Sequence, residues 1–279
     1  MTLLSILLAL IVGFLAGVLV NALADSMPYF RRPRLPLYPP SLKAEGELPL
    51  PPPRPYIAWS GLIAYLTGNQ THTASGNALR LRHPIVEVFM ALFFGYAAAN
   101  WPNHERLVIW MIYLTILMLV TIIDIEHYLI LFPVIIPALL IALVVAVVFP
   151  ESDRQTSDYL IGAVVGGGLY LVMFWGGGLF AGFVSSARGQ QLDEVAFGFG
   201  DVLLATLCGL MIGWQAFIFA SLITVIAGAV GALLFIVGRL LVKRQYDFFT
   251  PLPYGPYIVL GTVIMMLWRE EIRNFLTGG

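Results

Sequence analysis

The chain has 279 residues, of which 59% are hydrophobic and only 11% are charged, and its formal net charge is −1. Soluble domains carry about 25% charged residues, so this composition excludes an ordinary soluble protein and predicts an all-α, polytopic membrane protein. The single cysteine, Cys208, excludes an intramolecular disulfide and a cysteine-rich zinc site. We expect a lipid bilayer around the chain, no metal and no nucleic-acid partner.

Apolar segments recur along the chain at lengths that suit membrane-spanning helices, which need about 20 apolar residues. We expect about eight spans, with these ranges: 2–24, 85–101, 107–124, 129–149, 159–183, 201–214, 216–241 and 254–268. The first has no basic residue before its apolar run, so we interpret it as a retained helix and not as a cleaved signal peptide.

The distribution of basic residues predicts the orientation, because cytoplasmic loops carry an excess of lysine and arginine. With eight spans, the side that holds the loops after the first, third, fifth and seventh carries eleven of the 15 basic residues, counting Arg239 at the end of the seventh span, and the other side carries four. We therefore expect the eleven residues to face the cytoplasm and both termini to lie outside.

Proline marks the one sizeable segment between spans. Residues 27–55, "MPYFRRPRLPLYPPSLKAEGELPLPPPRP", hold ten of the 18 prolines, which disfavour helix and sheet and predict extended, irregular chain. The residues after it are apolar enough to pack on the membrane face. We divide the chain into a first transmembrane helix (1–24), a cytoplasmic proline-rich loop region without cysteine motifs (25–84) and a seven-helix core (85–279).

Two aspartates stand at the ends of expected spans. Asp124 ends the third and Asp201 begins the sixth, so the predicted topology puts both at the cytoplasmic boundary. Ionisable groups at membrane depth cost free energy and usually mark function. Two nearby carboxylates in a low-dielectric site share a proton, and such a pair can activate water and polarise a peptide carbonyl. The pair predicts aspartic-peptidase chemistry.

Glycines directly before Asp201 fit the same hypothesis. Gly198 and Gly200 have no side chain to hold an extended substrate away from the backbone. Other interpretations stay open from the residues alone. Asp201 could cap the sixth helix, Asp124 could pair with His127, or both could line an ion or proton path in a transporter.

Glu87 is a third acidic residue placed within an expected span. It could face a polar cavity and contact substrate, or it could pair with Arg82 or His83. We take Glu87 as a candidate substrate-binding residue.

Stretches spread over nearly the whole chain resemble those of one enzyme family. "GFGDVLLATLCGLMIGW" and "IIDIEHYLI" are similar to the two catalytic motifs of the prepilin peptidases, the type IV leader peptidases of the GxGD aspartic class. "GVLVNALADSMP", "RHPIVEVFMALFF" and "PLPYGPYIVLG" are similar to that family's first span, the start of its second span and the start of its last span. The resemblance assigns Asp124 and Asp201 to the catalytic positions.

The resemblance also implies a substrate and a location. Family members sit in the bacterial inner membrane and cut the short basic leader from type IV prepilins or type II secretion pseudopilins, after a glycine at the cytoplasmic face. The proteolysis needs no cofactor. Many members also methylate the new N-terminus with S-adenosylmethionine, and the sequence leaves open whether this chain does so.

Departures from the family pattern are confined to positions outside the aspartates. The paired CxxC motifs of many members are absent, and Leu203 stands where many have lysine. Two rival functions are a proton-coupled transporter, which would more often show repeated halves, and a non-catalytic pilus or secretion assembly factor, which would tolerate loss of an aspartate. We find no internal repeat, and both aspartates are present.

Overall fold

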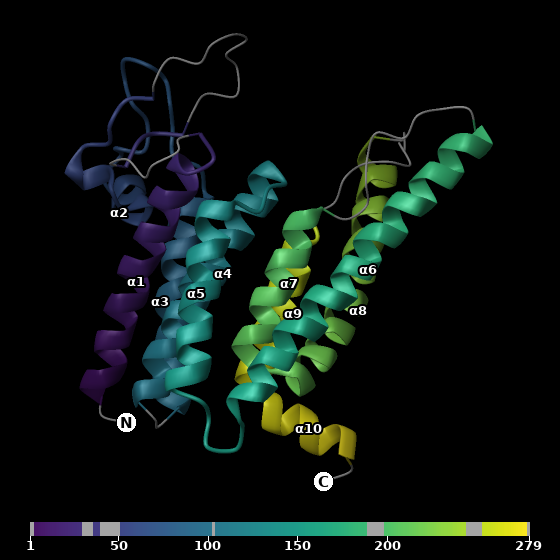
Figure 1. Ribbon diagram of the computed structural model, residues 1–279. Helices are drawn as coiled ribbons and strands as arrows, with labels where there is room; N and C mark the ends of the chain where they lie inside the picture. The colour runs from purple at the N-terminus through teal and green to yellow at the C-terminus, as the bar shows by residue number, and fades with distance from the viewer. Residues whose placement is uncertain are drawn as a thin grey trace. The chain divides into compact units, whose positions relative to one another are not determined.

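The computed structural model describes residues 3–29, 36–39, 51–101, 104–188, 198–243 and 253–277. Over these residues the fold is all-α, as predicted, with two isolated β-bridges (Figure 1). The α-helices have these bounds: α1 Leu3–Ser26, α2 Gly61–Leu66, α3 Arg82–Asn100, α4 His104–His127, α5 Phe132–Val148, α6 Thr156–Arg188, α7 Phe199–Ile212, α8 Trp214–Lys243, α9 Gly255–Leu267 and α10 Arg269–Thr277.

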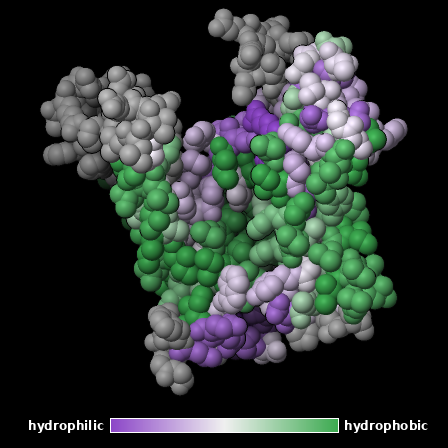
Figure 2. All heavy atoms as spheres, turned by 180° about the vertical axis from the view of Figure 1, so that it is seen from behind, coloured by the Kyte–Doolittle hydropathy of each residue, from purple (hydrophilic) through white to green (hydrophobic). Residues whose placement is uncertain are grey.

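Each of the eight ranges expected to span a membrane overlaps one of these helices over most of its length. Among the described residues, four helices are long and apolar enough to cross a bilayer: Leu3–Ser26, Arg106–His127, Thr156–Leu179 and Trp214–Gly238. α5, α7 and α9 are shorter apolar helices. On the face seen in Figure 2, hydrophobic residues cover broad areas and strongly hydrophilic residues gather in separate patches, as expected of a polytopic membrane protein.

The chain divides into two compact units, Met1–Leu119 and Val120–Gly279, and α4 runs through the division. In the first unit, α1 packs side by side with α3 (Figure 1). Two glycines of α1 permit this close approach. A Cβ on Gly13 would lie 2.4 Å from the Met90 oxygen, and a Cβ on Gly17 would lie 2.7 Å from the Glu87 Cα.

The loop region between α1 and α3 folds into a small module where it is described. Bridges join Leu37 to Pro53 and Thr71 to Ala78, and a 3₁₀ turn, Tyr56–Ala58, precedes α2. Its core holds four buried residues: Tyr38, Ala58, Ala64 and Leu79. Part of the proline-rich stretch predicted to be irregular, residues 30–35 and 40–50, lies outside the described residues.

The second unit contains the end of α4 and helices α5 to α10. α6 lies along α7 (Figure 1), and the two backbones are in contact at Gly162 and Gly209. A Cβ on Gly162 would lie 2.2 Å from the Gly209 oxygen, so there is room only for glycine. α7 ends at Gly213, whose φ of 75° suits glycine, and α8 starts at the next residue. The helix break predicted between the sixth and seventh spans is therefore a single residue, Gly213.

We expect Gly162→Ala to lower the free energy of unfolding by about 1–3 kcal/mol, because the new methyl group would collide with the α7 backbone. Gly168→Ala is the matched control in the same helix, since a Cβ there would meet nothing within 4 Å. The control should unfold like the wild type or be more stable by up to ~1 kcal/mol. Thermal unfolding in detergent measures both, and equal melting temperatures would refute the close α6–α7 contact.

Candidate active site

Both predicted catalytic aspartates belong to the second unit. Asp124 lies in the last turn of α4 and is 5% exposed, and Asp201 lies in the first turn of α7 and is half-buried. The two carboxyl groups lie close enough to interact electrostatically. Residues 77 positions apart in the sequence are thus brought together, at the meeting of one helix's C-terminus with another's N-terminus.

Asp201 is held by the backbone of its own helix end. Gly198 is the N-cap of α7 with an extended backbone, and its N–H donates to Asp201 Oδ2 over 3.0 Å. The capping role considered from the sequence is therefore present. It engages one carboxylate oxygen, so it is compatible with chemistry at the other.

Asp124 is held by a residue far away in the sequence. The N–H of Gly255, the first residue of α9, donates to Asp124 Oδ2 over 3.0 Å. His127, the partner considered from the sequence, has its Nε2 4.0 Å from the Glu126 carboxylate. Sequence reasoning did not assign Gly255 a role, although the glycine between tyrosine and proline in "PYGPY" was a signal at the start of the last span.

The two predicted substrate glycines have different surroundings. Gly200 faces Ile130, just beyond α4, because a Cβ there would lie 2.8 Å from the Ile130 Cβ. Gly198 is exposed, and the nearest atom to a Cβ there would be Asp201 Oδ2 at 3.8 Å. Gly200 thus lets α7 approach the α4–α5 turn. Gly198 is exposed, although its N–H and its carbonyl are both hydrogen-bonded to Asp201.

Glu87 belongs to the first unit, where its side chain is fully buried. Its carboxylate accepts hydrogen bonds from Ser60 Oγ and Gly61 N–H at 2.7 Å and from Leu62 N–H at 3.0 Å. Asn21 adds a longer bond of 3.3 Å. These contacts fasten the start of α2 to α3, since the first N–H groups of a helix lack partners within it.

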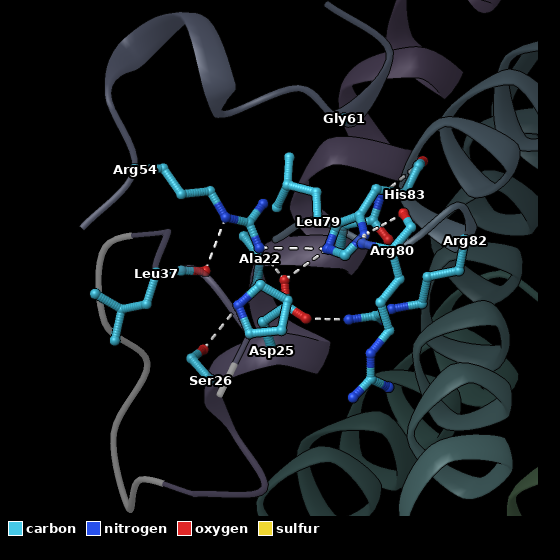
Figure 3. A network of polar contacts seen from close by, with 12 residues as sticks. Ala22, Asp25, Ser26, Leu37, Arg54, Gly61, Leu79, Arg80, Arg82 and His83 are labelled. Atoms are coloured by element: carbon cyan, nitrogen blue, oxygen red, sulfur yellow. Dashed lines mark hydrogen bonds and ion pairs between the residues drawn. The ribbon is translucent and has the colours of Figure 1, made fainter. Parts of the chain in front are cut away.

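Arg82 and His83, the expected partners of Glu87, contact a different carboxylate. Asp25, in the last turn of α1, forms ion pairs with Arg54 and Arg82, and its Oδ2 lies 2.9 Å from His83 Nε2 (Figure 3). Burial lowers the pKa of the Arg54 guanidinium below its ordinary value, although the Asp25 charge opposes this shift. This buried network, which sequence reasoning missed, ties the loop module to α1 and α3.

In the parts of the chain that the structure describes, no group of three or more His, Cys, Asp or Glu side chains is placed to hold a metal ion. In the first unit, the acidic side chains that the structure describes, Asp25 and Glu87, are buried and occupied by internal contacts. They do not fit a role in binding S-adenosylmethionine, and we derive no methylation step from them.

A family profile and full-length relatives both relate this chain to leader peptidases. The profile of a family described as the Type IV leader peptidase family matches residues 111–233, which include both aspartates. Two proteins named "Prepilin leader peptidase/N-methyltransferase" align with nearly the whole chain. The one from Stutzerimonas stutzeri is 26% identical over 96% of this chain and 92% of its own length. The one from Pseudomonas aeruginosa is 28% identical over 98% of this chain and 92% of its own.

A more distant relative carries the same name. The Bacillus subtilis protein is 24% identical over 77% of this chain and 77% of its own length. No solved structure matches the chain.

Proposed function

We propose that this chain, which belongs to the type IV leader peptidase family, is an aspartic endopeptidase that removes the leader of prepilins or pseudopilins with Asp124 and Asp201 as its catalytic pair. The observation that carries the proposal is the meeting of the C-terminal end of α4 with the start of α7, where Gly200 approaches Ile130 and the Asp124 and Asp201 carboxyl groups interact electrostatically. The comparisons name peptidases and favour neither a transporter nor an assembly factor.

The chemistry follows from one proton shared by two carboxyl groups. The charged carboxylate takes a proton from the attacking water, and the protonated carboxyl donates a hydrogen bond to the scissile carbonyl oxygen. A new C–O bond gives a tetrahedral intermediate. The C–N bond then breaks as the leaving nitrogen receives the proton that the first carboxylate took from water.

The hydrogen bonds from two glycine N–H groups are compatible with these roles of the aspartates. Gly198 and Gly255 each engage Oδ2 of one aspartate, which leaves Oδ1 of each to meet water, the substrate or the other carboxyl. We assign Gly198 to contact with the extended substrate because its backbone is exposed. We assign Glu87 to anchoring α2, in place of a contact with substrate.

Orientation belongs to the same proposal. We place the aspartates at the cytoplasmic face of the inner membrane with both termini outside, on the basis of the eleven-to-four distribution of basic residues. The names of the relatives include N-methyltransferase, so we propose S-adenosylmethionine as the methyl donor for any methylation of the cut product. Transfer of a labelled methyl group to that product tests this point separately from cleavage.

Cleavage by the purified chain tests the proposed function. We expect a peptide with a basic leader, a glycine and an apolar segment to be cut after the glycine, and mass spectrometry of both products identifies the bond. The rate should be the same with and without EDTA, because a carboxylate pair activates water without a metal. The control is a peptide with the glycine replaced by leucine. Failure of folded protein to cut such precursors, or inactivation by EDTA, would refute the proposal.

A further inference from the structure

We infer that Gly255 is a positioning residue for catalysis, which fixes the Asp124 carboxylate through its backbone N–H and leaves no room for any side chain of its own. This inference rests on the proposed catalytic role of Asp124. It assigns the start of α9 to the active site, together with the ends of α4 and α7.

At the start of α9, Gly255 supplies the backbone N–H that donates to a distant residue. Pro256, the next residue, has no N–H. The N–H groups of Tyr257 and Ile258 donate to the Tyr254 carbonyl at 3.0 and 3.3 Å. The Gly255 N–H donates to Asp124 across a sequence separation of 131 residues. The positive end of the α9 dipole adds to this attraction for a carboxylate.

The missing side chain is as important as the N–H. A Cβ on Gly255 would lie 2.6 Å from Asp124 Oδ2 and 3.4 Å from Leu204 Cδ2. Leu204 is fully buried and lies in the same helix as Asp201, three residues further along. The Asp124 carboxylate is therefore confined between α9 and α7, so the spacing of the two carboxyl groups depends on a glycine at position 255.

The two aspartates differ in what holds them. The bond from Gly198 to Asp201 joins residues three apart, so α7 makes it alone. The bond from Gly255 to Asp124 needs α9 in place. α9 is fixed on α8 by the Thr224 Oγ1 bond to the Tyr257 carbonyl at 3.1 Å and by the close approach of Gly261 to the Ala220 oxygen. The position of the Asp124 carboxylate thus depends on the docking of α9 against α8.

Gly255→Ala tests the inference through kinetics. We expect kcat for the leader peptide to fall by ~100-fold, as for a catalytic group misplaced by about 1 Å, while KM stays within about threefold because the substrate-binding residues are unchanged. Gly168→Ala, which adds the same methyl group to an open position, should leave both constants unchanged.

A double-mutant cycle gives a readout that does not depend on activity. Asp124→Ala removes the atoms that the new methyl group would meet, so the loss of melting temperature caused by Gly255→Ala should shrink in that background. The loss caused by Gly162→Ala, whose collision is with α7, should be the same with aspartate or alanine at 124. If Gly255→Ala does not accumulate, the double variant should accumulate.

The possible failures are distinct. Wild-type kcat in Gly255→Ala, with Asp124→Asn inactive, would overturn the positioning role and leave the proposed function standing. Equal costs of Gly255→Ala in both backgrounds, or failure of Asp124→Ala to restore accumulation, would also overturn it. Normal cutting by Asp124→Asn would refute the catalytic pair itself.

Discussion

Asp124→Asn and Asp201→Asn should each reduce leader cleavage by about 10³-fold or more, because either change removes the group that shares a proton with its partner. Asparagine keeps the shape of the side chain and can still accept the glycine N–H through its oxygen. Both variants should therefore fold and accumulate in membranes. Cleavage of a co-expressed prepilin-like precursor, followed by its change in mass, measures the effect.

Asp158→Asn is the matched control for this experiment. Asp158 lies in the first turn of α6, and its Oδ2 accepts from the Gln155 N–H at 2.9 Å, the same three-residue spacing as Gly198 and Asp201. Its Oδ1 also accepts from Trp214 Nε1 at 3.3 Å. Neither contact belongs to the proposed active site, and a helix cap should tolerate asparagine, so Asp158→Asn should cut at the wild-type rate. If Asp201→Asn behaves like this control, then Asp201 is a cap and the catalytic pair is refuted.

Asp25→Ala should destabilise the first unit by about 3–5 kcal/mol, because it removes the carboxylate that compensates a buried arginine. The side chain of Arg54 is fully buried, and Asp25 also contacts Arg82 and His83. Limited proteolysis at 51–81 and thermal unfolding in detergent measure the loss. The loop module should become sensitive to protease before the helices do.

An exposed ion pair serves as the control for this prediction, and a second substitution at Arg54 tests its cause. Asp153→Ala removes a carboxylate that is 55% exposed and paired with Arg269 at 3.3 Å, so it should cost at most about 1 kcal/mol. Arg54→Leu in the Asp25→Ala background should recover part of the stability, because the unpaired buried charge is gone. Wild-type unfolding of Asp25→Ala would contradict the proposed role of the network.

Much of the fold could be predicted from the sequence because apolar length is a local property. Every expected range overlaps a helix, and the aspartates lie at helix ends as the topology implied. Long-range partners could not be predicted in this way. Nothing near Asp124 specifies Gly255, which follows 131 residues later, and nothing near Glu87 showed that its neighbours Arg82 and His83 would turn to Asp25.

Single glycines illustrate the same limit. A glycine in a membrane helix signals close packing, but the sequence does not say against what. Gly162 meets α7, Gly255 meets a carboxylate, and Gly168 meets nothing within 4 Å. Only tertiary structure separates these three cases.

The backbone contact between α6 and α7 also limits how a pilin-like helix can arrive. Helices that touch through Gly162 and Gly209 leave no width for a third helix between them, and Gly261 against the Ala220 oxygen closes α8 and α9 in the same way. We therefore expect no lateral gate at either pair. Gly198 and Phe199, at the start of α7, are exposed, Phe199 by 47%. We therefore expect the leader junction of a substrate to reach Asp201 from this side.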